Sequence, residues 1–153
     1  MTPADIIFVG QVPLDALQSA LAAEHAAVWA YGLVGAFLAD ELADQLVEAA
    51  VAHRARRDGI ERVLIDAGVP PVPAEPAYLI PEPVTDNASA LRLTITVETD
   101  TAAAWRSVIE RGPAEPSLRR AALDGLTGAA VRAARWRAAA GSAPVTVPFP
   151  GTP

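Results

Sequence analysis

Three residues of this sequence could do chemistry together: Glu24, His53 and Glu98. Each of them stands within an otherwise largely apolar stripe of residues repeated at spacings of three and four. A carboxylate on an apolar helix face must be paired, hydrogen-bonded, protonated or bound to a metal. The residue types therefore predict either a buried polar network or a metal site.

The positions of these residues bring them to one level of the molecule. Glu24 lies 15 residues before Ala39, where the first predicted helix pair turns, and Glu98 lies 15 residues before Pro113, where the second pair turns. At a rise of 1.5 Å per residue, each glutamate is roughly 22 Å from its turn. His53, on the returning helix of the first pair, falls within one turn of that level. We expect the three side chains to converge.

Two interpretations of this convergence follow. In the one we favour, arginines and a protonated histidine neutralise the two glutamates. The predicted network comprises Glu24, Tyr31, His53, Arg54, Arg57 and Glu98. In the other, Glu24, His53 and Glu98 bind one iron, manganese or zinc ion through two carboxylates and an imidazole.

A di-iron centre needs more ligands than the sequence provides. Di-iron four-helix bundles take one glutamate from each of two helices and a Glu-x-x-His motif from each of the other two. Ala50 stands where the motif of His53 needs its glutamate, and we find no ligand in the stretch 126–134 of the last helix. Half of the ligand set is missing, which predicts that di-iron chemistry is lost.

Four helices are needed to position these residues. The apolar periodicity predicts them over roughly 14–38, 41–67, 86–111 and 117–140. Short connections make the first two helices antiparallel neighbours, and likewise the last two. The proline-rich stretch 69–84 predicts an extended crossover. The fold is therefore predicted to be all-α: a ferritin-like four-helix bundle with one long crossover between helices two and three.

The length of 153 residues suggests one domain. We place the bundle at 13–141, including the crossover 69–84. An N-terminal arm, 1–12, precedes it, either extended against the bundle or a partner, or loosely ordered. An extended, charge-free tail follows at 142–153.

Single side chains carry further expectations. Tyr78, Leu79 and Ile80 should hold the crossover to the bundle, and Phe149 should pack the tail against it. His25 points about 100° away from the stripe of its neighbouring glutamate, and we expect it to be partly exposed.

Composition excludes several classes of function. The net charge of −6 argues against nucleic acid as a partner, and the absence of cysteine excludes disulfides and thiolate metal sites. The longest charge-free run in a helical pattern, 26–39, is shorter than the roughly 20 residues of a membrane span. Without a signal-like N-terminal segment, the expected location is the cytoplasm. The sequence contains no glycine-rich phosphate loop and no Gly-x-Ser-x-Gly motif.

Three segments resemble a known family. They are Glu24-His25-Ala-Ala-Val-Trp-Ala-Tyr-Gly, His53-Arg54-Ala-Arg56-Arg57-Asp58, and the crossover Tyr78…Pro81…Pro83-Val84-Thr85-Asp86. Over roughly residues 12–140 the chain resembles the actinobacterial ferritin-like domain of unknown function DUF4439. The resemblance implies a ferritin-like four-helix bundle and no established activity or cofactor.

The sequence therefore predicts a non-catalytic binding or structural module that has lost the di-iron site and has no cofactor. A homodimer is expected, because a second apolar stripe (Trp29, Leu33 and Phe37) and the alanine-rich last helix offer more apolar surface than one bundle needs. The alternative is a metal-dependent oxidoreductase or metal-storage protein. In a third interpretation, the crossover and the tail cover a small-molecule pocket between helices.

Overall fold

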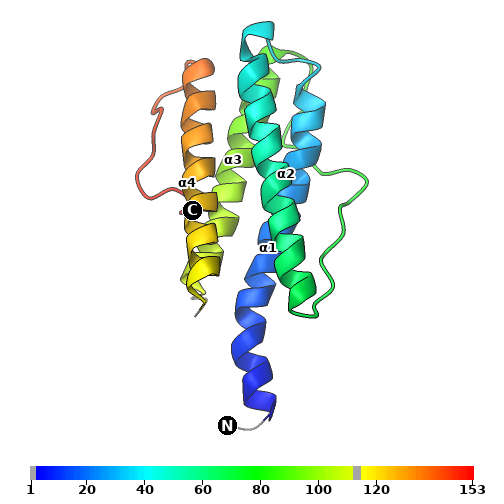
Figure 1. Ribbon diagram of the computed structural model, residues 1–153. Coiled ribbons are helices and arrows are strands. Elements are labelled where there is room, and N and C mark those ends of the chain that lie inside the picture. The colour runs from blue at the N-terminus through cyan, green and yellow to red at the C-terminus, as the bar shows by residue number, and fades with distance from the viewer. Residues whose placement is uncertain (1–2, 112–114) are drawn as a thin grey trace.

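The computed structural model describes the backbone of residues 3–111 and 115–153, and the side chains of 14–111 and 115–153. Its elements are α1 (Pro3–Val34), the short 3-10 helix η1 (Asp40–Leu42), α2 (Ala43–Asp66), α3 (Asn87–Glu110) and α4 (Pro116–Ala139). Figure 1 shows the four α-helices side by side, with α1 and α4 running in one direction and α2 and α3 in the other. No strand occurs in the described ranges. The predicted all-α four-helix bundle is confirmed.

The predicted crossover connects the end of α2 to the start of α3 at the opposite end of the bundle (Figure 1). Gln18 of α1 holds its first part: its side-chain Nε2 donates to the Pro70 carbonyl at 2.7 Å, and its Oε1 accepts from the Val72 amide at 2.8 Å. Further along, the rings of Tyr78 and Trp29 lie 5.8 Å apart. The crossover is therefore fixed to α1 over much of its length.

Tyr78 and Ile80 contact the bundle as expected, but the prediction for Leu79 is wrong, since this side chain is fully exposed. Neighbouring side chains of an extended chain point to opposite sides, so only alternate residues can face the helices. The prediction for Phe149 is also wrong: its side chain is 75% exposed, and the tail approaches α3 through Gly151 instead.

Helix α1 is longer at its start than the sequence predicts. It begins at Pro3, so the extended arm predicted for 1–12 is helical from Pro3 onward, and residues 1–2 lie outside the described part. We placed the start near Pro13 because proline is well tolerated in the first turn of a helix. The residue before a proline is disfavoured from helical angles but can still adopt them, and here the helix continues through this position. The helix also ends earlier, at Val34, where Gly32 and Gly35 lower the helix propensity.

The ends of the other helices lie within about two residues of their predicted positions. The sequence offers Thr85 or Asp86 as the cap of α3, and Asp86 takes this role, because its Oδ1 accepts from the Ser89 amide at 2.8 Å. Gly68 follows α2 with a φ of +72°, the left-handed conformation that favours glycine after a helix. The predicted end of helix three at Gly112 lies outside the described residues.

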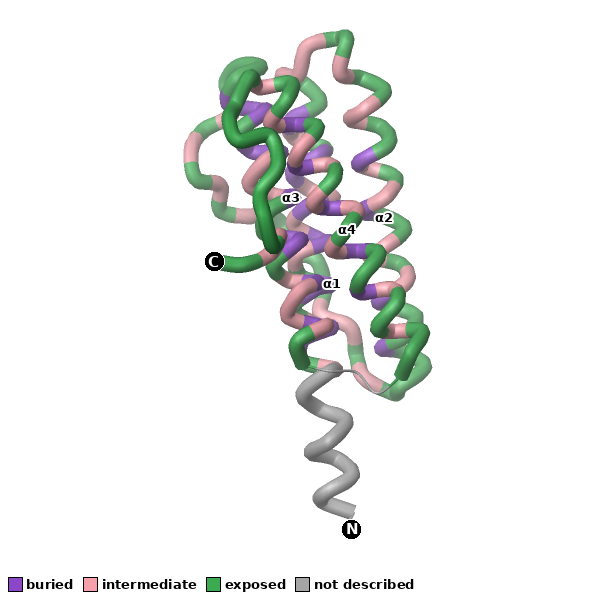
Figure 2. The backbone as a smooth tube through the Cα atoms, turned by 90° about the vertical axis from the view of Figure 1, so that its left-hand side faces the viewer, coloured by how far each residue is buried: buried purple, intermediate pink, exposed green. Residues whose placement is uncertain are grey.

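The buried side chains form two apolar clusters, one on each side of a polar layer (Figure 2 shows the buried residues along the inner faces). The first cluster consists of Ala16, Leu17, Ala20, Leu21, Ile60, Leu64, Trp105, Val108 and Ala122. The second consists of Ala30, Tyr31, Val34, Ala49, Ala90, Leu91, Leu93 and Trp136. The polar residues between them form the candidate site.

Candidate functional site

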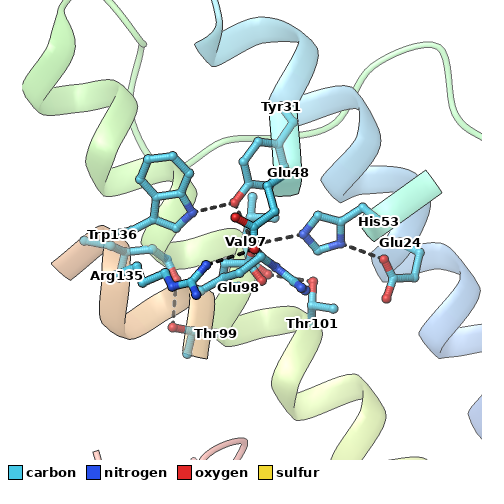
Figure 3. A network of polar contacts seen from close by, with 12 residues as sticks. Glu24, Tyr31, Glu48, His53, Val97, Glu98, Thr99, Thr101, Arg135 and Trp136 are labelled. Atoms are coloured by element: carbon cyan, nitrogen blue, oxygen red, sulfur yellow. Dashed lines mark hydrogen bonds and ion pairs between the residues drawn. The ribbon is translucent and has the colours of Figure 1, made fainter. Parts of the chain in front are cut away.

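The centre of the site is His53 of α2, which lies between two glutamates (Figure 3). Its ring Nδ1 is 2.7 Å from Oε2 of Glu24 on α1, and its Nε2 is 3.0 Å from Oε1 of Glu98 on α3. All three side chains are fully buried. The structure thus brings the three residues of the predicted convergence into one hydrogen-bonded chain.

Both ring nitrogens of His53 must donate if both carboxylates are ionised, because an ionised carboxylate can only accept. A neutral imidazole has one donor, so this geometry requires the imidazolium form. Burial of the ring lowers the pKa of His53, but the hydrogen bonds to Glu24 and Glu98 outweigh it and raise the pKa above its ordinary value. The two hydrogen bonds therefore favour the charged form of His53.

Glu98 is the most heavily bonded member. Its Oε1 accepts from the Tyr31 hydroxyl at 2.6 Å, from His53 Nε2, and from Arg132 Nε of α4 at 2.9 Å. Burial raises the pKa of Glu98, but the contacts with His53 and Arg132 outweigh it and hold the pKa below its ordinary value. This carboxylate is ionised in the folded protein.

Two tryptophans complete the network. Trp105 Nε1 donates to Glu24 Oε1 at 2.7 Å, and Trp136 Nε1 donates to the Tyr31 hydroxyl at 2.7 Å. Burial, followed by the negative charge of Glu98, raises the pKa of Tyr31 well above its ordinary value, so the hydroxyl keeps the proton that it donates to that carboxylate. From the sequence alone we would expect both tryptophans to be ordinary core or interface aromatics, and their polar role carries no signal there.

The charges of the network sum to zero. Glu24 and Glu98 each carry one negative charge, and His53 and Arg132 each carry one positive charge. A buried set of charges is tolerated when each is paired and hydrogen-bonded, and this set meets that condition without an added ion.

The arginines predicted to neutralise the glutamates do not do so. Arg54 is exposed, and Arg57 pairs with its neighbour Asp58 through Nη2 and Oδ1 at 2.8 Å. Arg54 follows His53 directly and so lies about 100° around α2 from it, and the guanidinium of Arg57 is used by Asp58. Arg132 supplies the charge instead. It is the one charged residue of the stretch 126–134, which lies level with Glu98, so its position in the sequence held the signal that we missed.

His25 lies apart from the network. It is 7% exposed, its Nε2 donates to the Val72 carbonyl at 3.0 Å, and the same nitrogen is 3.8 Å from Glu61 Oε1. The prediction that His25 is partly exposed is wrong, because the crossover covers it. Its role is to hold that crossover.

The residues present do not fit a di-metal centre. Ala50 offers no carboxylate, and both nitrogens of His53 are directed at glutamate oxygens, so neither has a lone pair for a cation. The guanidinium of Arg132, bound to Glu98, adds a positive charge where a metal would need a negative one. Within the described residues, no group of three or more His, Asp or Glu side chains has a metal-binding arrangement.

A family model supports the likeness seen in the sequence. The model for DUF4439, a domain of unknown function, matches residues 16–153. The chain belongs to this family. The fold of this DUF4439 protein is similar to the crystal structure of a conserved hypothetical protein, rv2844, from Mycobacterium tuberculosis, with 37% identity and a TM-score of 0.84. The match covers 93% of this chain and 99% of that one. No curated protein matches the sequence.

Proposed function

We propose that this DUF4439 protein is a non-catalytic, ferritin-like binding or structural module. In it, an ionic network occupies the level at which di-iron bundles hold their metal ions. The observation that carries the proposal is the position of His53, whose two nitrogens both donate to glutamates. A histidine used in this way links two carboxylates and leaves no site for an ion between them.

The burial of the network supports a role without catalysis. A general acid or base must come within hydrogen-bond reach of the group that it protonates or deprotonates. Glu24, His53 and Glu98 are fully buried, and each binds another member of the network. In the resting fold, a substrate could reach Glu24 or His53 only by displacing the helices.

Metal analysis tests the proposal. The protein is purified without chelator and its iron, manganese and zinc contents are measured by mass spectrometry, in parallel with Glu24→Gln as the matched variant. We expect well below one ion per chain in both proteins and a melting temperature that does not change when a chelator is added. Near-stoichiometric metal in the natural protein that is lost in the variant would overturn the proposal in favour of a metal-dependent oxidoreductase or storage protein.

No described helix is both long enough and apolar enough to cross a lipid bilayer. The homodimer stays a prediction. The stripe of Trp29, Leu33 and Phe37 is half-buried and packs against the second apolar cluster, which reduces the surface available to a partner. Leu123 and Val131 of α4 remain 54% and 47% exposed. Light scattering at micromolar concentration decides between a dimer and a monomer.

A further inference from the structure

A cavity lined mainly by apolar side chains, and also by the fully buried Glu98, lies beside the network. It has a volume of about 420 Å³, within the range of about 300–1,000 Å³ that is typical of small-molecule sites. Its walls come from α3, α4 and the C-terminal tail. The lining includes Glu98, Ala102, Leu126, Ala130, Val147 and Gly151.

The tail forms the outer wall of this cavity. Figure 1 shows it leaving the end of α4 and returning along that helix to about half its height. Gly151 brings the tail close to α3: a Cβ atom built on this residue would lie 2.7 Å from the Ala102 carbonyl oxygen, and its φ of +81° also favours glycine. The contact holds the tail over the space between α3 and α4.

Glu98, which lines the inner wall, has an acceptor without a donor. Oε1 of Glu98 accepts three hydrogen bonds, whereas the buried Oε2 has no hydrogen-bond partner within the described residues. Buried carboxylate oxygens are normally hydrogen-bonded, and an unpaired one is unfavourable. A molecule that enters the cavity and donates a hydrogen bond would satisfy this oxygen.

The charge of the network selects the kind of donor. Because Glu24, Glu98, His53 and Arg132 are already balanced, a buried ammonium group would add an unpaired positive charge. A carboxylate would be repelled by Glu98. A hydroxyl donates a proton without adding charge, and an apolar body suits walls of alanine, leucine and valine.

We propose that this cavity binds a small, neutral, apolar alcohol, with the ligand hydroxyl donating to Oε2 of Glu98. The tail closes over the apolar body of the ligand, and the hydroxyl is directed toward the polar layer. This site deepens the proposed binding role and rests on it, since it needs Glu98 to be bound by side chains and not by a metal.

Isothermal titration calorimetry with three probes tests the proposal. 1-Octanol has an apolar chain and a hydroxyl, heptyl methyl ether has the same size without a donor, and octanoate has a negative charge. We expect octanol to bind and the other two to bind at least about tenfold more weakly. Absence of octanol binding, or equal binding of octanol and the ether, would overturn the proposal. Octanoate binding as tightly as octanol would do the same, because it would place the polar contact at Arg137 on the cavity wall.

Cavity-filling variants locate the binding. Ala130→Leu places a larger side chain in the cavity and should weaken octanol binding at least about tenfold. Ala138→Leu makes the same change at an exposed position of α4 outside the cavity lining and should leave binding unchanged. Circular dichroism confirms folding, and Ala134→Leu replaces the first variant if that one does not fold. Unchanged octanol binding in the cavity variant overturns the site. The metal analysis described under the proposed function tests the network separately. Failure of the ligand proposal is therefore distinguishable from failure of the proposed function.

Discussion

Removal of Glu24 is the sharpest test of the network. In Glu24→Ala, His53 Nδ1 and Trp105 Nε1 both lose their acceptor inside a fully buried site. Breaking a buried charge network by removing one partner costs about 3–5 kcal/mol of unfolding free energy. For a chain of this size, roughly 2–4 °C is lost per kcal/mol, so the melting temperature should fall by about 6–20 °C.

Urea unfolding and thermal melts measure this loss, with Glu48→Ala as the matched control. Glu48 also forms an ion pair, with Arg135 at 2.9 Å, but both side chains are at least half exposed. Such a pair contributes about 0–1 kcal/mol, so the control should melt close to the natural protein. Equal shifts in the two variants would refute the reasoning, because burial of the pair would then make no difference.

Three further predictions concern other parts of the network. Arg132→Met removes a charged donor from Glu98 and should cost about 1.5–3 kcal/mol of unfolding free energy, measured in urea. The control Arg54→Met, at an exposed position, should change it by no more than about 0.5 kcal/mol. A larger loss in the Arg54 variant than in the Arg132 variant would show that Arg54, as predicted from the sequence, neutralises the glutamates. Gly125→Ala places a Cβ atom 2.6 Å from the Trp105 ring, so it should lower the free energy of unfolding by about 1–3 kcal/mol and change the tryptophan fluorescence. The control Gly32→Ala has open space around the new Cβ atom and should raise the free energy of unfolding by about 0.5–1 kcal/mol. The stabilisation by His53 is the difference in unfolding free energy between the natural protein and His53→Gln. It should be full below pH 6.5, the ordinary pKa of the ring, and should decrease as the pH rises through the higher pKa of the folded state. A difference that grows with pH above 6.5 would contradict the imidazolium form.

The helices could be predicted from the sequence because their apolar periodicity is long and their ends carry local signals. Gly68, which follows α2 with a positive φ, and Asp86, which caps α3, are such signals. Contacts of the irregular segments could not be predicted in the same way. Whether Leu79 or its neighbours face the bundle depends on the twist of an extended chain without a regular period, and the position of Phe149 depends on how the tail folds back.

The site was predictable where helix geometry fixes the distance between residues, and not where the direction and reach of a long side chain decide which partner it meets. Levels counted from the turns brought Glu24, His53 and Glu98 together, since backbone rise is nearly constant. Which arginine pairs with Glu98 depends instead on what each arginine side chain can reach. Arg54 is exposed and Arg57 pairs with Asp58, whereas Arg132 reaches Glu98 from a helix that approaches α3 closely at Gly125.

The network also explains how a core of small residues keeps one alignment of its helices. Alanines are numerous in both apolar clusters, and packing surfaces made of similar small side chains specify position weakly, because different alignments bury similar areas. The hydrogen-bonded chain contains members from all four helices: α1 gives Glu24, α2 gives His53, α3 gives Glu98 and α4 gives Arg132. A slip of any helix by one turn, about 5.4 Å, would carry its member out of hydrogen-bond reach and leave charges buried without partners. The polar layer therefore penalises every misaligned packing that the apolar clusters alone would tolerate.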